Sequence, residues 1–263
     1  MRFLPCAVAA LPLMLAACAS APPSSSASMA TEPQTSATRA GVEPVLPTCI
    51  DLRPTFAEWN LPPRPQGHRG TCSIFTTCEA IEFAHAKSTG KPIRLSPEFV
   101  NWAASQAAGG PSDGNFFFNA VAGFEKHGVC TEERMPYRKS FDAKKGPSTE
   151  ASAEAAALRD GAKSTLRVRW IQPWKPDVMG VSEEMLQEMK RVIASGYPVA
   201  AGSGHSRLFV GYHDNPDLAG GGAFITEDSA LNRYDEVTYR WVRDNVADAF
   251  WVEALPATTA FAQ

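Results

Sequence analysis

The sequence has 263 residues, of which 44% are hydrophobic and 10% aromatic, enough for one or two domains with a substantial apolar core. Its formal net charge is -3 at pH 7, and no stretch carries a nucleic-acid motif. Without a basic field, electrostatic binding to nucleic acid is excluded as a main function. The composition therefore predicts a globular protein that acts on something other than DNA or RNA.

The first 17 residues have the composition of a targeting segment. Arg2 supplies a positive charge, and the largely apolar run 3–17 is too short to span a membrane with ordinary flanks. Leu15-Ala16-Ala17-Cys18 resembles the bacterial lipobox, which implies cleavage before Cys18 and lipid attachment to it. A plain secretory signal is the alternative. The resemblance implies that the protein is lipid-anchored in the bacterial cell envelope. Ala19, rather than an aspartate, follows the cysteine, which is compatible with sorting to the outer membrane, facing the periplasm or the exterior.

The composition changes after the targeting segment. Residues 18–45 are rich in Ser, Pro and Ala and too polar to pack, so they are expected to form a disordered tether. A single folded domain is expected over residues 46–255, followed by a short tail at 256–263.

A glutamine, two glycines and a cysteine precede a helical pattern. In Gln66-Gly-His-Arg-Gly-Thr-Cys72, the thiol would lie in the first turn of a buried helix, because the apolar residues that follow recur at helical spacing. The free amides and positive dipole end of a helix N-terminus favour the thiolate, the nucleophilic form of cysteine. Gln66 could direct its amide at an oxygen that becomes negative beside the sulfur. This stretch predicts Cys72 as a nucleophile, whereas a lone helical cysteine would be a small buried hydrophobe.

A base for this thiol lies in a later apolar run. His205 precedes the run 207–212, which has the composition of a buried strand, and a second run, 223–226, ends shortly before Asp228. Two adjacent strands would bring Asp228 to His205 and orient its imidazole. Asp228 could instead be a turn residue, with Glu227 or another side chain orienting the histidine. No His and Cys residues have zinc-site spacing, so neither a metal nor a cofactor is expected.

The remaining pattern places helices before strands. Helices are expected over residues 72–87, 97–106, 117–127, 151–159 and 182–194, and strands over 166–170, 199–201, 207–212, 223–226 and 250–253. Helices first and antiparallel strands later predict an α+β fold.

These motifs together resemble the papain-like cysteine peptidases, particularly their bacterial members, over about residues 46–252. The order of Gln66, Cys72, His205 and Asp228 is similar to the family's order of glutamine, cysteine, histidine and asparagine or aspartate. Further matching segments are Leu95-Ser96-Pro97-Glu98-Phe99-Val100, Gly128-Val129-Cys130-x-Glu132, Pro136-Tyr137, Gly196-Tyr197-Pro198-Val199 and Val210-Gly211-Tyr212. The resemblance implies two subdomains, a helical N-terminal half and an antiparallel, barrel-like β half, with the active-site cleft between them.

The resemblance also carries expectations about smaller segments. The loop 109–114 would border the substrate cleft, which makes Asp113 and Gly114 candidate substrate contacts, although a solvated turn fits as well. The segment 51–53 would cross to the β half. The chain departs from the family at Asp228-Ser229-Ala230-Leu231, where Asn-Ser-Trp-Gly is usual, and at Ser73, where a tryptophan usually follows the nucleophile.

The six cysteines leave room for one disulfide. Cys6 would leave with the signal peptide, Cys18 would carry lipid and Cys72 would remain reduced. In an oxidising compartment, two of the other three could pair, namely two of Cys49, Cys78 and Cys130. The sequence does not choose the pair, and Cys78 with Cys130 is a guess from their shared half.

The sequence therefore predicts a membrane-tethered, extracytoplasmic cysteine peptidase that cleaves peptide or protein substrates through an acyl-enzyme. One alternative is an amidase or acyl transferase that acts on cell-wall peptide with the same nucleophile. Another is a non-catalytic binding module that keeps the fold. The intact set of Gln66, Cys72 and His205 argues against the binding module. Neither the oligomeric state nor the substrate side chain is predicted.

Overall fold

The computed structural model describes residues 45–163 and 165–255. The predicted signal peptide at 1–17, the Cys18 lipid site, the tether up to residue 44 and the tail 256–263 lie outside these residues. From Leu46 onward, the described residues belong to one compact unit. None of the helices described is both long enough and apolar enough to cross a membrane.

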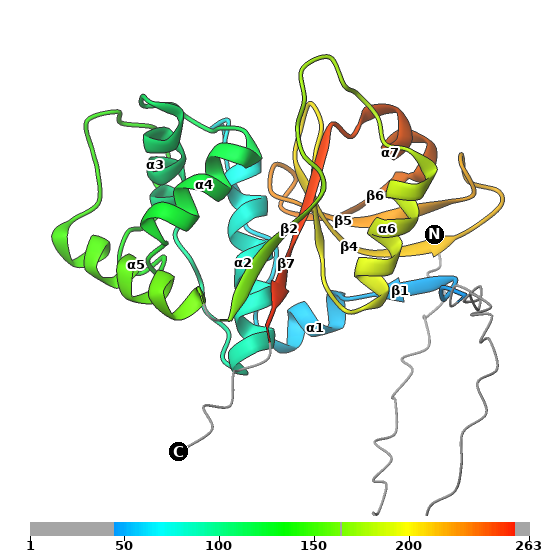
Figure 1. The fold of residues 1–263 in the computed structure, drawn as a ribbon, viewed down its shortest axis with the longest axis horizontal. Helices are drawn as coiled ribbons and strands as arrows, with labels where there is room; N and C mark the ends of the chain where they lie inside the picture. The colour runs from blue at the N-terminus through cyan, green and yellow to red at the C-terminus, as the bar shows by residue number, and fades with distance from the viewer. Residues whose placement is uncertain (1–44, 164, 256–263) are drawn as a thin grey trace, which may run out of the picture. The chain divides into compact units, whose positions relative to one another are not determined.

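Helices mostly precede strands along the chain, as the sequence predicts, and Figure 1 shows their arrangement. The helices are α1 (Arg53–Glu58), α2 (Cys72–Thr89), α3 (Pro97–Ala108), α4 (Phe117–His127), α5 (Thr149–Ala162), α6 (Glu183–Ala194) and α7 (Tyr239–Asn245). The strands are β1 (Cys49–Asp51), β2 (Leu166–Gln172), β3 (Val199–Gly202), β4 (Arg207–Asp214), β5 (Gly222–Asp228), β6 (Arg233–Thr238) and β7 (Asp248–Ala254). This arrangement confirms the α+β class.

Local sequence sets the ends of the helical half. Ser96 caps α3 by accepting a hydrogen bond from the Phe99 amide at 3.0 Å, and Pro97 stands in the first turn, where a backbone amide would have no helical partner. Gly90 and Gly109 end α2 and α3 in the left-handed region, with φ of 68° and 85°. The helices α3, α4 and α5, green in Figure 1, lie on the opposite side of α2 from the sheet.

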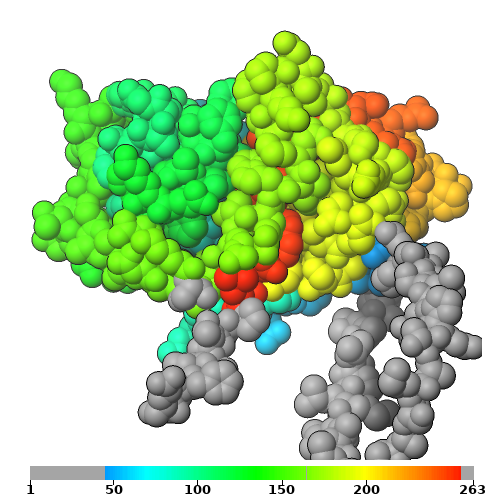
Figure 2. All heavy atoms as spheres, in the orientation of Figure 1, coloured from blue at the N-terminus to red at the C-terminus, as the bar shows by residue number. Residues whose placement is uncertain are grey.

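Both halves pack on α2. Its side chains are buried on all faces, including the apolar residues Ile74, Phe75 and Ile81 that predicted it, so it is a central helix rather than a surface one. It contacts α3 and α4 on one side and β3, β4 and β7 on the other. The helical and β halves are in direct contact in the space-filling view (Figure 2). The first turn of α2, which begins at Cys72, is therefore supported by both halves.

The strands form one antiparallel sheet in the order β2-β7-β3-β4-β5-β6, with β1 paired to β4 off this path. The pairing of Asp51 with Gly211 confirms that the segment 51–53 crosses to the β half. Among the described strands no pairing joins β2 to β6, so the sheet is open. The expected β half is thus present, but it does not close into a barrel.

Four short elements were not predicted from the sequence. They are β1, α1, β6 and α7. The helix α1 has 6 residues, too few to show a helical period. The strand β6 is largely exposed at the edge of the sheet and carries Arg, Asp and Glu, so it lacks the apolar alternation by which strands are recognised.

The guessed disulfide between Cys78 and Cys130 is wrong, because both are free thiols. Each is fully buried and packs in the apolar core as a small hydrophobe, and burial raises the pKa of both thiols. The guess relied on their shared half of the fold, which does not by itself bring two Cα atoms within the 4.4–6.8 Å, roughly, that a disulfide needs.

Candidate active site

Cys72 is the first residue of α2, directly after Thr71 at the N-cap. The loop before it is held from the helical half: the Thr71 hydroxyl lies 2.6 Å from the Tyr137 hydroxyl, which donates to the Gln66 carbonyl at 2.9 Å. Gly67 takes a positive φ of 65°, which a glycine adopts without strain. These contacts fix the turn that presents the thiol, as the sequence predicts.

His205 lies just before β4 in a turn of its own. The Ser203 hydroxyl accepts a hydrogen bond from the His205 amide at 3.2 Å and donates to the His205 carbonyl at 2.6 Å. Antiparallel pairing of β4 with β5 brings the beginning of β4 beside the end of β5. His205 Nε2 consequently lies 2.9 Å from Asp228 Oδ1. The two predicted runs are adjacent strands, and they bring Asp228 to the histidine.

Asp228 is a fully partnered carboxylate. Its Oδ1 also accepts the backbone amides of Ala230 at 2.9 Å and Leu231 at 3.0 Å, and its Oδ2 accepts Arg207 Nε at 3.1 Å. Burial opposes ionisation of this group, but the hydrogen bonds from His205 and Leu231 and the charges of His205 and Arg207 lower its pKa below the usual value. Asp228 is therefore held as an anion beside the imidazole.

The thiol and the imidazole shift one another's pKa in opposite directions. Burial opposes ionisation of Cys72, but hydrogen bonds from His205 and from the Ser206 backbone outweigh it, so the Cys72 pKa is lowered. The hydrogen bond to Cys72 raises the pKa of His205; burial opposes this, and the hydrogen bond and charge of Asp228 reinforce it. Since Asp228 occupies Nε2, Nδ1 is the nitrogen left for the sulfur. The geometry favours a thiolate–imidazolium pair.

Besides the bond from Tyr137 to its carbonyl, three further hydrogen bonds hold Gln66 in place. Its Nε2 donates to the Arg69 carbonyl at 2.8 Å, its Oε1 accepts the Ser229 hydroxyl at 2.7 Å, and its backbone amide donates to the Ser229 carbonyl at 3.0 Å. The second Nε2 hydrogen has no acceptor among the described residues, so it remains able to donate to a bound ligand. Ser229 thus ties Gln66 to the segment that carries Asp228.

The two candidate substrate contacts differ in position. Asp113 accepts Arg69 Nε at 2.9 Å, so its carboxylate holds the loop rather than facing the cavity. Gly114 lines the cavity beside Cys72, with a φ of 89° and no room for a side chain, because a Cβ would lie 1.8 Å from the Gly70 carbonyl oxygen. Substrate contact by either residue stays a prediction.

Arg207 is a site residue that the sequence did not reveal. Besides its bond to Asp228, its guanidinium lies 5.3 Å from the ring centroid of Trp241 in α7, so it packs between the carboxylate and an aromatic side chain. Arg207 follows His205 by only two residues, and this nearness in the sequence was the available signal. The contribution of Trp241 had no local signal, because Trp241 lies 34 residues after Arg207 along the chain.

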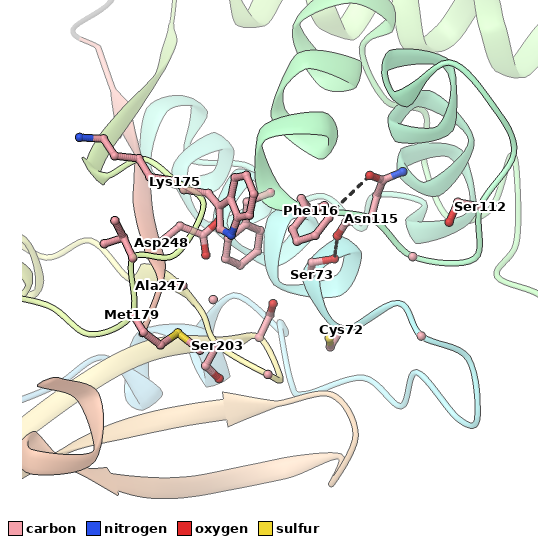
Figure 3. Close-up of a pocket in the computed structure, with 18 of the residues that line it drawn as sticks. Cys72, Ser73, Ser112, Asn115, Phe116, Lys175, Met179, Ser203, Ala247 and Asp248 are labelled. Carbon is pink, nitrogen blue, oxygen red and sulfur yellow. Dashed lines mark hydrogen bonds between the residues drawn. The ribbon is translucent and has the colours of Figure 1, made fainter. Parts of the chain in front are cut away.

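A cavity of about 610 Å³ opens beside the thiol, lined by both halves of the fold. Figure 3 shows Cys72 and Ser73 on one side of it and Ser203, Ala247 and Asp248 across from them. Ser73, which replaces the usual tryptophan, donates its hydroxyl to the Asn115 carbonyl. The predicted cleft between the halves is present, and it exposes the sulfur to a peptide-sized ligand.

A thiol paired with a histidine that a carboxylate orients, at the edge of such a cavity, is an arrangement typical of cysteine hydrolases. Residues 46–254 match the sequence profile described as "Papain family cysteine protease", and the chain belongs to that family. It is a cysteine-type peptidase.

Solved structures share the fold. The fold is similar to that of xylellain, a cysteine protease from Xylella fastidiosa, with a TM-score of 0.62 and 18% identity over 80% of this chain and 87% of that one. It is also similar to digestive procathepsin L 3 from the larval midgut of Tenebrio molitor, with a TM-score of 0.58 and 17% identity over 81% of this chain and 71% of that one. At these identities the likeness shows the fold. No curated protein sequence matches this chain.

Proposed function

We propose that the Cys72 thiolate attacks the carbonyl carbon of a substrate peptide bond and forms an acyl-enzyme. The His205 imidazolium then protonates the leaving amine, and as a neutral base it activates the water that releases the acyl group. The observation that carries the proposal is the pairing of His205 Nε2 with Asp228 Oδ1 at 2.9 Å, which leaves Nδ1 to the thiol. Asp228 would hold the ring in this tautomer and orientation.

Oxyanion stabilisation would come from the start of α2. The Cys72 backbone amide is one of the helix N-terminal groups without a helical acceptor, and the remaining Nε2 hydrogen of Gln66 is the second donor. Because Gln66 is held by Arg69 and Ser229, this donor would need no reorganisation as charge develops on the substrate oxygen.

The test is turnover of a peptide library together with mass mapping of a stoichiometric alkylating agent at neutral pH. Wild type should cleave peptides and carry the label on Cys72 alone, and Cys72→Ala should lose both while remaining folded. Cys130→Ala is the matched control, because that thiol is buried and free, and it should keep label and turnover. Label on Cys78 or Cys130 would remove Cys72 from the proposal, and turnover of cell-wall fragments without turnover of peptides would replace peptidase with amidase or transferase activity.

We also propose that the protein is a lipoprotein of the bacterial cell envelope, tethered at the outer membrane through Cys18. Support comes from the sequence Leu15-Ala16-Ala17-Cys18 and the polar segment after it. Cys18→Ser should move the protein from the membrane fraction to the soluble fraction. An unmodified mature N-terminus located further along the chain would contradict the lipid anchor.

A further inference from the structure

A buried carboxylate that the reaction does not use lies in the wall of the cavity. Asp248 is the first residue of β7 and pairs with Gly202 of β3. It is 5% exposed. Its side chain lies over Gly202, where an added Cβ would come 1.9 Å from Asp248 Oδ1, so the glycine leaves the space that this carboxylate occupies.

The Asp248 side chain has no hydrogen bond or ion pair within the described chain. Two other buried carboxylates, those of Asp228 and Glu98, are paired with cations: Asp228 with Arg207, and Glu98 with Arg69 and Arg138. Burying a carboxylate without a partner is unfavourable, and here burial raises the pKa of Asp248 to about 6. At pH 7.5 the group is still mostly ionised, which makes it a buried anion that lacks a counter-ion.

The surroundings of Asp248 are largely apolar. Phe116, Phe117, Trp174 and Met179 line the same cavity, and the rings of Phe116 and Trp174 lie 5.3 Å apart at its edge. Lys175 also lines the cavity, but Figure 3 shows its side chain extending away from Asp248 with the amino group outward. The cavity therefore offers apolar walls and a buried, unpaired carboxylate across from the nucleophile.

We propose that this cavity binds a lysine or arginine side chain of the peptide substrate, with its cationic end paired to Asp248. This substrate preference rests on the proposed peptidase function. The aliphatic stem of such a side chain packs against aromatic walls, and its charged end supplies the counter-ion that Asp248 lacks. Uncharged side chains of similar shape pack against the same walls but leave the Asp248 carboxylate unpaired, so the enzyme discriminates against them.

The experiment compares matched fluorogenic peptides that carry arginine or its uncharged isostere citrulline at each position around the scissile bond. At one position, kcat/KM at pH 7.5 should favour arginine by about 10- to 100-fold, the range given by a charge-assisted hydrogen bond. Asp248→Asn should bring this ratio close to one, with the citrulline peptide hydrolysed as by wild type. Asp217→Asn, which removes an exposed carboxylate from the loop after β4, is the matched control and should keep the preference.

The arginine-to-citrulline ratio should also fall as the pH is lowered through about 6, where Asp248 takes up a proton. Titration of Cys72 and His205 affects both substrates and cancels in the ratio. The other charged groups that line the cavity, Lys175 and Asp177, are exposed. A ratio that follows pH in Asp248→Asn as it does in wild type would overturn the assignment to Asp248.

The two proposals fail in different ways. Cys72-dependent cleavage with no basic preference at any position, or a preference that survives in Asp248→Asn, overturns the basic-residue cavity and leaves the peptidase intact. A protein that cleaves no peptide of the library loses both proposals.

Discussion

Glu227 and Asp228 are neighbours on β5 with the same burial and opposite surroundings. Each is 1% exposed, and consecutive strand residues point to opposite faces of the sheet. Asp228 faces the active site and has His205, Arg207 and two backbone amides as partners. Neither carboxylate oxygen of Glu227 has a hydrogen-bond partner in the described structure.

The ionisation of the two residues follows their partners rather than their burial. The Asp228 pKa is lowered, whereas burial, together with the nearby Glu79 and Glu82, raises the pKa of Glu227 well above the usual value. Glu79, in α2, is affected in the same direction, with its pKa raised to about 8. On one side of β5, Asp228 is an anion that can stabilise an imidazolium. On the other side, Glu227 and Glu79 are carboxyl groups that favour the protonated form.

The largest effect on kcat/KM is expected from removing the Asp228 carboxylate, which orients His205. Asp228→Ala should lower kcat/KM by about 100-fold or more, because a misplaced catalytic group loses that much. Asp228→Asn should lose much less, about 3- to 10-fold, since an amide can still hold the ring. Both are measured as kcat/KM with a peptide substrate, after checking that the variants unfold cooperatively. Equal activity of both variants with wild type would mean that Asp228 is only a turn residue.

Removing the charge of Asp228 and removing the charge of Arg207 should move the alkaline limb of the pH–rate profile in opposite directions. The active pair is lost when His205 loses its proton. Asp228→Asn removes an anion that raises the His205 pKa, so the limb should move to lower pH. Arg207→Met removes a cation near the imidazolium but keeps an unbranched side chain beside Trp241, so the limb should move to higher pH, with a loss in kcat/KM of only about 3-fold.

Arg167→Met is the matched control for the Arg207 variant, because it removes an exposed arginine of β2 and should leave the profile unchanged. Movement of the limb in the same direction for Asp228→Asn and Arg207→Met would contradict the electrostatic account of the site.

The smallest effect is expected on the other face of β5 and concerns stability rather than activity. Between the usual carboxyl pKa and the raised pKa of Glu227, the native state holds a proton that the unfolded state lacks, so stability falls as pH rises. Glu227→Gln removes this loss. The variant should gain about 1 kcal/mol or more relative to wild type at pH 8, roughly 2–4 °C in Tm at this chain size, with little difference near pH 4.

Thermal unfolding at the two pH values checks this prediction. Glu58→Gln, at the exposed end of α1, is the matched control and should show no such pH-dependent gain. A gain for Glu227→Gln that is the same at both pH values would mean that packing, and not ionisation, is responsible.

The sequence predicted what local pattern determines. The beginning of α2 at Cys72 followed from its apolar spacing, and the meeting of His205 with Asp228 followed from two consecutive apolar runs that form a hairpin of adjacent strands. It did not decide between Glu227 and Asp228 as the partner of His205, because that choice depends on which face of β5 each residue occupies.

Features that depend on contacts between distant segments could not be predicted from local sequence patterns. Asp248 reaches the cavity only because β7 pairs with β3, and the unpaired state of its carboxylate depends on side chains from several distant segments. The edge strand β6 could not be predicted from the sequence for a different reason, because an exposed, charged strand has no apolar alternation.

The most direct test of the thiolate–imidazolium pair is the rate of Cys72 alkylation by iodoacetamide as a function of pH, in wild type and in His205→Ala. The structure predicts that wild type reacts with an apparent pKa below the ordinary thiol value of about 8.5, and that His205→Ala shifts this pKa upward. A wild-type rate that rises only around pH 8.5 and is the same in His205→Ala would contradict it.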